Sequence, residues 1–213
     1  GGKQYSLELP AGKRWFELSV VRKPTEPGEE ERFISIARDV TESKLSQEAI
    51  AHLAFHDSLT GLPNRRLMAE RLQSAITQCK RQPQHCALMF LDLDRFKHIN
   101  DTHGHETGDL LLQQVAQRLL QNVRAVDTVA RLGGDEFVVL LQTLSTDEAD
   151  ARVHACAVAY KLLSSLGEPY VLNGVDHTTT PSIGITLFKD DATSHQEILR
   201  QADTAMYAAK AKG

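Results

Sequence analysis

The stretch Arg131-Leu132-Gly133-Gly134-Asp135-Glu136-Phe137 lies between two apolar runs, and the rest of the chain is interpreted from it. Apolar residues precede it at Val126 and Val129, and they continue after it over residues 138–141. Two apolar runs joined through Gly-Gly predict a β-hairpin, because glycine adopts the positive φ that a tight turn requires.

Asp135 and Glu136 place two adjacent carboxylates at this turn. The glycines beside them carry no side chains, so a bulky ligand can approach the backbone. Carboxylates in such a gap suit a hard cation such as Mg²⁺, whose remaining ligands can be phosphate oxygens. A solvated acidic turn is the alternative interpretation of the same residues.

This stretch resembles the signature of the GGDEF family, the diguanylate cyclases, which join two GTP molecules into cyclic di-GMP. The resemblance covers the chain from about His56 to its C-terminus. It implies an α+β fold, in which a central, largely antiparallel sheet of about five strands is flanked by helices. Such a fold is similar to nucleotide-cyclase and polymerase palm domains. No Gly-x-x-x-x-Gly-Lys-[Ser/Thr] phosphate loop is present, so a metal and lysines would have to hold GTP.

The composition narrows the range of partners. The 213 residues carry a net charge of −4, whereas a nucleic-acid partner usually requires a basic face. The three cysteines are widely spaced and predict neither a disulfide framework nor a zinc site. No apolar run is long enough to span a membrane, and no signal peptide is visible. We therefore expect a cytoplasmic fragment without nucleic acid or membrane contact, which is compatible with membrane attachment of a longer protein.

Residues 1–41 are expected to be a fragment of a domain. Over residues 4–40 apolar and polar side chains alternate as in β-strands, with a solvated loop from Arg22 to Arg32. They resemble the C-terminal strands of a PAS sensor domain and end in the phrase Ala37-Arg38-Asp39-Val40-Thr41-Glu42. Three strands are too few to bury a core, so the resemblance implies that the ligand-binding part of the sensor lies outside this chain.

Residues 42–56 are expected to form a connecting helix, with Thr41 as its cap. Its apolar positions include Leu45, Ala49 and Leu53. Such a helix can pair with a copy of itself or pack on its own domain, and so short a seam specifies neither. Residues 57–213 are then the GGDEF domain. It opens with His56–Arg66, an ordered turn that leads into a helix from Arg66 to about Lys80 and contains no expected catalytic residue.

Cys86–Leu91 is a continuous apolar run that predicts a strand buried on both faces. A carboxylate directly after such a strand is costly unless it is paired or binds a cation, although a strand-end aspartate facing water is common. The resemblance implies that Asp92, the Leu93 carbonyl, Asp135 and Glu136 bind Mg²⁺, for which Mn²⁺ is a possible substitute.

The resemblance also implies the catalytic groups, which are Asp135, Glu136 and Lys97. Lys97 and the metal would stabilise charge at the α-phosphate while the 3′-hydroxyl of a second GTP attacks it. Either Asp135 or Glu136 would accept the hydroxyl proton. Because each domain would hold one GTP, two domains must face each other, most simply as a C2 homodimer.

Four further residues are substrate-binding by resemblance: Asn100, Asp109, Phe96 and Lys210. Asn100 and Asp109 would face the guanine, and Lys210 would contact phosphates. A carboxylate can accept two N–H groups from the N1/N2 edge of guanine, and adenine has no such pair. The alternative for Asp109 is an acid at a helix start, favoured by the helix dipole, because it is expected to open a helix that ends at about Val123.

Arg124 and Asp127 form an Arg-x-x-Asp motif at the end of that helix. In the family, this motif at this offset from the signature is an inhibitory site for the product, cyclic di-GMP. A guanidinium binds guanine or phosphate through its planar fork, and a carboxylate accepts guanine N–H groups. A surface ion pair is the alternative.

The remaining segments complete the expected fold. Residues 147–166 are predicted to form an amphipathic helix, and residues 182–188 and 194–212 a strand and the last helix. A hairpin around Asn173-Gly174 is expected to pair residues 170–172 with residues 177–180. The inward face of the helix predicted over residues 147–166 is expected to consist of Ala149, Val153, Cys156, Tyr160 and Leu163.

Two functions are compatible with the sequence. The first is a Mg²⁺-dependent, product-inhibited diguanylate cyclase that releases pyrophosphate and acts as a dimer in bacterial second-messenger signalling. The second is a non-catalytic module of the same fold that binds GTP or cyclic di-GMP and regulates a neighbouring domain. The intact acids Asp135 and Glu136 favour the enzyme, because degenerate modules usually lose them.

Overall fold

The computed structural model of the chain describes residues 3–10, 12–24, 31–189 and 193–212. The chain divides into two compact units, Gly1–Ala54 and Phe55–Gly213, and each is described by itself. Most of the loop expected from Arg22 to Arg32 falls on residues 25–30, outside the described residues.

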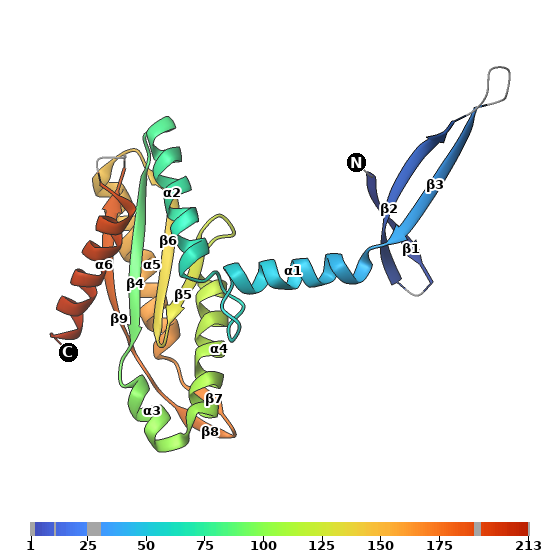
Figure 1. The fold of residues 1–213 in the computed structure, drawn as a ribbon. Helices are drawn as coiled ribbons and strands as arrows, with labels where there is room; N and C mark the ends of the chain where they lie inside the picture. The colour runs from blue at the N-terminus through green and yellow to red at the C-terminus, as the bar shows by residue number, and fades with distance from the viewer. Residues whose placement is uncertain (1–2, 11, 25–30, 190–192, 213) are drawn as a thin grey trace. The chain divides into compact units, whose positions relative to one another are not determined.

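Within the described residues, the first unit is an antiparallel β-meander followed by a helix (Figure 1). Its elements are β1 (Lys3–Leu9), β2 (Gly12–Lys23), β3 (Arg32–Asp39) and α1 (Thr41–Phe55). Large apolar side chains of this unit are exposed, among them Val21 at 61% and Phe33 at 60%. The meander therefore buries little core of its own, as three strands predict.

The start of α1 differs from the prediction that Thr41 caps it. The Thr41 hydroxyl accepts a hydrogen bond from the Trp15 N–H at 2.8 Å, so it ties the helix to β2. The Asp39 carboxylate instead accepts the Thr41 N–H at 2.9 Å. Leu45 and Leu53 on α1 are exposed within the first unit. Packing of this seam on its own domain and pairing with a second copy both stay predictions.

The second unit contains a four-stranded antiparallel sheet in the order β5-β6-β4-β9 and a separate β7–β8 hairpin, among the residues that are described. The strands are β4 (His85–Leu93), β5 (Thr128–Gly133), β6 (Glu136–Ser145), β7 (Tyr170–Leu172), β8 (Val175–His177) and β9 (Pro181–Phe188). The helices are α2 (Arg65–Arg81), α3 (Phe96–His103), α4 (His105–Asn122), α5 (Glu148–Gly167) and α6 (His195–Lys210). The predicted α+β class, an antiparallel sheet flanked by helices, is confirmed.

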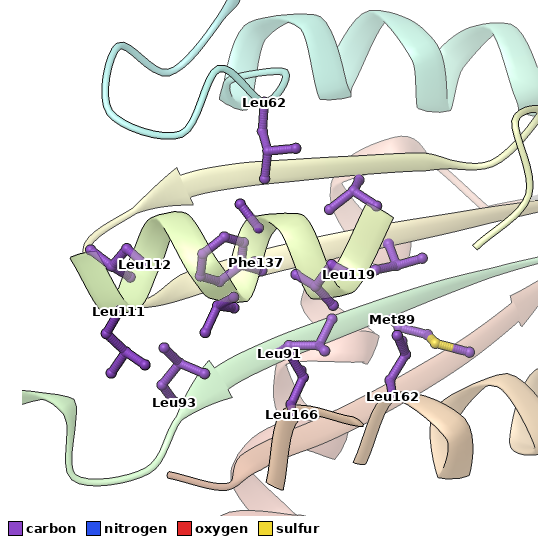
Figure 2. Close-up of a cluster of buried hydrophobic side chains, with 14 of the residues drawn as sticks. Leu62, Met89, Leu91, Leu93, Leu111, Leu112, Leu119, Phe137, Leu162 and Leu166 are labelled. Atoms are coloured by element: carbon purple, nitrogen blue, oxygen red, sulfur yellow. The ribbon is translucent and has the colours of Figure 1, made fainter. Parts of the chain in front are cut away.

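Both faces of the sheet are covered, which is why β4 is apolar without interruption. Alternate residues of β4 enter opposite cores: Met89 and Leu91 pack with α4 and α5, whereas Leu88 and Phe90 pack with α2 and α6. Figure 2 shows the first core around Phe137, which is 0% exposed. The sheet is therefore a rigid layer between two helical layers.

The bounds of two predicted elements need correction. α4 begins at His105 rather than Asp109, because the helical turn α3 ends at Gly104, where a positive φ of 83° lets a new helix start at once. Asp109 consequently lies in the second turn of α4. The strand after Asn173-Gly174 covers Val175–His177 rather than residues 177–180, because positive φ at both turn residues permits a two-residue turn.

The predicted inward face of α5 was wrong. Val153 and Tyr160 are 65% and 73% exposed. The helix instead buries a stripe of small residues followed by two leucines: Ala151, Ala155, Ala159, Leu162 and Leu166. Alanine lets α5 lie close to β6 and α4, so the larger side chains of the helix are directed away from the sheet.

In the described part of the chain, no helix is both long enough and apolar enough to cross a bilayer.

Candidate active site

The predicted acidic residues meet because of strand register. β4 and β6 pair antiparallel with Asp92 opposite Glu136, so two carboxylates lie on neighbouring strands at the same end of the sheet. The β5–β6 turn carries Asp135 beside them, and the C-terminal end of α6 approaches the same end of β4 (Figure 1). There the Lys210 ammonium donates a hydrogen bond to Asp92 Oδ1.

The signature turn has the backbone that its glycines permit. Gly133 and Gly134 have φ values of 144° and 52°, and Gly133 pairs with Glu136 across the hairpin. A side chain at either glycine would be strained at these angles. The predicted hairpin is confirmed, with Asp135 in the turn and Glu136 as the first residue of β6.

The site concentrates negative charge. Burial raises the pKa of Asp135 above its usual value, and the charge of Asp92 adds to this shift. Burial also raises the pKa of Glu136, while the Arg65 guanidinium at 3.5 Å opposes it. The hydrogen bond to Asp92 raises the pKa of Lys210. Carboxylates that repel one another in a partly buried site would be stabilised by a bound cation.

The donor set fits a magnesium ion shared with a substrate rather than a site made by protein alone. No three described acidic, histidine or cysteine side chains lie close enough to form a preassembled metal cluster. Mg²⁺ is commonly held by one or two carboxylates together with substrate phosphates and water. Asp92 and the acids of the turn supply such carboxylates.

The Leu93 carbonyl points to the side of β4 on which β6 and the acidic side chains lie. Asp94 N–H donates to the Thr180 carbonyl at 2.8 Å, so the peptide groups of Asp94 point toward β9. Successive residues of a strand direct their peptide groups to alternate sides, so those of Leu93 point toward β6 and the signature turn. This orientation is compatible with the predicted role of Leu93 as a backbone metal ligand.

Asp94 has a different role from Asp92, although both follow the buried part of β4. Its two carboxylate oxygens accept hydrogen bonds from Ser182 Oγ at 2.9 Å and Thr180 Oγ1 at 2.8 Å. These contacts fasten the end of β4 to the start of β9. Asp94 is therefore a structural residue, and Asp92 is the aspartate available to the site.

The predicted guanine-binding residues lie on two consecutive helices. Asn100 is in α3 and Asp109 is in α4, and the Asn100 side chain lies against Gly108, directly before Asp109. Asp109 is exposed. Phe96 is only 8% exposed and belongs to the core beneath Asn100, whereas Lys97 is exposed on α3. The structure thus brings Asn100 and Asp109 to the same junction and places the Phe96 ring below it.

The Arg-x-x-Asp motif forms a turn after α4 rather than the end of the helix. Asp127 Oδ2 accepts the Arg124 N–H at 2.9 Å, and Asp127 Oδ1 accepts the Gln142 N–H at 3.1 Å. The Asp127 carboxylate therefore holds the turn through backbone groups instead of forming the surface ion pair considered above. Arg124 is exposed and lines a cavity of about 310 Å³ together with His154 and Lys161 of α5.

The sequence interpretation missed the hydrogen bonds by which Arg131 ties the signature turn to Asp57, called here the Arg131 clamp. Arg131 NH1 donates to both oxygens of Asp57, at 2.9 and 3.0 Å. The same guanidinium donates to the Gly134 carbonyl from Nε at 2.9 Å and from NH2 at 2.8 Å. The side chains of Arg131 and Asp57 are 11% and 20% exposed. The signal was a positively charged residue two positions before Gly-Gly, but its partner is 74 residues away.

Gly184 is a second residue that the sequence interpretation missed, and it has no sequence signal. A Cβ added there would lie 2.1 Å from both the Ala202 carbonyl oxygen and the Met206 nitrogen of α6. Glycine thus allows the α6 backbone to touch β9, which brings Lys210 to Asp92.

Comparisons with known proteins agree with this arrangement. The family model for "Diguanylate cyclase, GGDEF domain" matches residues 54–213. The chain is 46% identical over 164 residues to the bifunctional diguanylate cyclase/cyclic di-GMP phosphodiesterase MucR of Pseudomonas aeruginosa, an alignment that covers 77% of the chain and 23% of MucR. The chain likewise spans only 25% of the signaling protein YkoW of Bacillus subtilis, at 37% identity over 95% of the chain.

Solved structures show the same fold. The GGDEF domain of TpbB from Pseudomonas aeruginosa superimposes with a TM-score of 0.68 at 42% identity, covering 74% of this chain and 90% of that one. The GGDEF domain of DgcB from Caulobacter crescentus, solved in complex with c-di-GMP, gives a TM-score of 0.66 at 28% identity, covering 75% of this chain and 92% of that one.

Proposed function

This chain belongs to the GGDEF diguanylate cyclase family, and we propose that it joins two GTP molecules into cyclic di-GMP with release of pyrophosphate. The observation that carries the proposal is the strand register that sets Asp92 opposite Glu136 at one end of the sheet, with Asp135 in the adjoining turn. Diguanylate cyclases of this family depend on a divalent metal, and these acids have the chemistry to hold one beside a triphosphate.

We propose the following roles for the groups of this site. A Mg²⁺ or Mn²⁺ ion would be held by Asp92, Asp135, Glu136 and the Leu93 carbonyl, and it would supply positive charge beside the α-phosphate. Lys97 and Lys210 bind the triphosphate as cations. Either Asp135 or Glu136 accepts the proton of the attacking 3′-hydroxyl.

Asn100 and Asp109 are proposed to recognise guanine. The Asp109 carboxylate can accept the N1 and N2 hydrogens of guanine, and Asn100 can donate to a neighbouring acceptor of the base. Each buried polar group left unpaired costs roughly 1–3 kcal/mol. Adenine would leave two groups unpaired, which corresponds to roughly thirty-fold to ten-thousand-fold weaker binding at about 1.4 kcal/mol per decade.

The wider arrangement is also a proposal. Each domain supplies one half-site, so the active species is a homodimer, and cyclic di-GMP at Arg124 inhibits it. The strands before α1 are proposed to be the last strands of a PAS-like domain, with α1 connecting them to the cyclase. We propose that this part of the protein acts in the cytoplasm.

The test is incubation with GTP and Mg²⁺, followed by chromatographic separation of the nucleotides. We expect cyclic di-GMP and pyrophosphate, and we expect Asp135→Asn to lower turnover by roughly 10²–10³-fold, as the loss of one preorganised electrostatic group does. Full turnover by Asp135→Asn would contradict the role of the turn. If the chain instead binds cyclic di-GMP but forms none from GTP, it is the non-catalytic regulatory module.

A further inference from the structure

The side chain of Asn100 is in an unusual environment. Its Oδ1 atom is buried without a hydrogen-bond partner, and it is the one side-chain oxygen or nitrogen of that kind among the residues that the structure describes. The atom lies against the backbone of α4. A Cβ atom added at Gly108 would be 1.9 Å from Oδ1 and 3.0 Å from Cγ of Asn100.

Two features that reduce stability therefore meet at one contact: an unpaired buried oxygen of Asn100 and a glycine within a helix. A buried carbonyl oxygen without a donor loses its hydration and gains no hydrogen bond in return. Glycine in the interior of a helix is less favourable than alanine, because it loses more backbone freedom on folding. Gly108 is the fourth residue of α4, and its φ does not require glycine. The added Cβ would also lie 3.3 Å from Phe96 Cζ, so the glycine leaves space first for the Asn100 amide and then for the tip of the Phe96 ring.

The contact fixes which end of the amide can meet a ligand. With Oδ1 buried against α4, Nδ2 is the polar atom of Asn100 that remains able to donate to a bound base. Asp109 follows Gly108 directly and is exposed, so it presents an acceptor at the same junction. A donor and an acceptor side by side match guanine, whose edge carries both O6 as an acceptor and N1–H as a donor. Adenine carries the opposite pattern.

We propose that Gly108 is a positioning residue for base specificity: the absence of its side chain holds the Asn100 amide in the orientation that distinguishes guanine from adenine. The inference rests on the proposed guanine-binding role of Asn100. A methyl group at position 108 would displace the amide, while Asp109 and the acids of the signature turn keep their places.

The experiment compares Gly108→Ala with Gly167→Ala. Gly167 is also a helical glycine, but a Cβ there meets nothing within 4 Å, so its variant controls for the change from glycine to alanine. The dissociation constants of GTP and ATP are measured by calorimetric titration. In Gly108→Ala we expect the preference for GTP over ATP to fall at least about ten-fold, the equivalent of one lost base contact, with ATP binding unchanged. Gly167→Ala should retain the preference of the parent chain.

A second measurement isolates the contact itself. In the background Asn100→Ala the obstructing amide is gone, so adding Gly108→Ala should change the nucleotide preference no further. Adding Gly108→Ala should lower the denaturation midpoint less in this background than in the parent chain, because only Phe96 Cζ, 3.3 Å from the added Cβ, then has to shift. This difference needs no nucleotide. If the parent chain binds no GTP, the proposed function fails while the difference between the midpoints still reports on the contact.

Three results would overturn the proposal. They are unchanged nucleotide preference in Gly108→Ala, an equal weakening of GTP and ATP binding, and a Gly108→Ala effect of the same size with and without Asn100. If Gly108→Ala does not fold, the double variant decides, because removal of the amide must restore folding for the proposal to stand.

Discussion

The clamp formed by Arg131 gives a sharp test of how the signature turn is held. Arg131→Ala removes two hydrogen bonds to the Asp57 carboxylate and two to the Gly134 carbonyl. Both charged side chains are mostly buried, so water cannot fully replace what is lost. The turn that carries Asp135 would then lose its anchor to the segment before α2.

The expected loss of unfolding free energy depends on the hydrogen bonds that Asp57 keeps in Arg131→Ala. Removing one partner of a buried ion pair typically costs about 3–5 kcal/mol. Here Asp57 keeps two hydrogen bonds, from the Thr60 N–H at 2.9 Å and the Thr60 hydroxyl at 2.6 Å, so it is not left bare. We therefore expect a loss near the lower limit, about 3 kcal/mol, which is roughly a hundred-fold change in the unfolding equilibrium at about 1.4 kcal/mol per decade.

Chemical denaturation at pH 7 measures this loss, with Arg152→Ala as the matched control. Arg152 pairs with Glu148 at 3.0 Å, but their side chains are 68% and 63% exposed, so that variant should change stability by no more than about 1 kcal/mol. Arg131→Lys keeps the charge without the fork and should fall between the two. If Arg131→Ala and Arg152→Ala unfold at the same denaturant concentration, the clamp does not stabilise the turn.

Three further outcomes follow from the structure. Burial raises the pKa of Asp57, but hydrogen bonds from Thr60 and Arg131 outweigh it and hold the pKa below its usual value. Stability from the pair is therefore complete above the unfolded pKa of about 3.9 and is lost as the pH falls through the lower folded value. Asp57→Asn should destabilise at pH 7, and its difference from the parent should shrink as the pH falls below about 3.9, as acid titration of unfolding would reveal. Arg124→Ala should weaken calorimetric binding of cyclic di-GMP and relieve product inhibition without changing stability, whereas equal affinity in both proteins would remove the inhibitory site. Gly184→Ala should cost at least about 1–3 kcal/mol in thermal unfolding, because its methyl group overlaps the α6 backbone, and unchanged stability would show that α6 can move away freely.

The parts of the fold that the sequence predicted are those where local pattern and tertiary packing agree. The apolar run Cys86–Leu91 is buried on both faces, and the Gly-Gly turn joins two strands as its composition indicates. The helix expected from Arg66 to about Lys80 after the ordered turn is present as α2, Arg65–Arg81. In each case the residue types leave few other conformations available.

The inward face of α5 failed because periodicity alone does not rank small residues against large ones. Val153 and Tyr160 recur at helical spacing, but so does the alanine stripe that starts at Ala151. Which stripe faces the sheet depends on how closely the helix must approach β6 and α4. That distance is a property of the assembled layers, and the sequence of the helix does not contain it.

The candidate site shows the same limit in another form. The acids that the sequence singled out do converge, because Asp92 and Glu136 end up opposite each other, yet this meeting is produced by the register of β4 against β6 and not by either local motif. The residues that the sequence passed over, Arg131, Gly108 and Gly184, act on backbone or amide groups of distant elements. These residue types are common in any sequence, and their roles become apparent only when the structure shows which group each one contacts. A glycine in a helix costs stability, and at Gly108 the missing side chain leaves the space that the amide of Asn100 occupies. The groups that would contact a nucleotide can thus be predicted from their side-chain types. The groups that would orient them can be identified only from the folded structure.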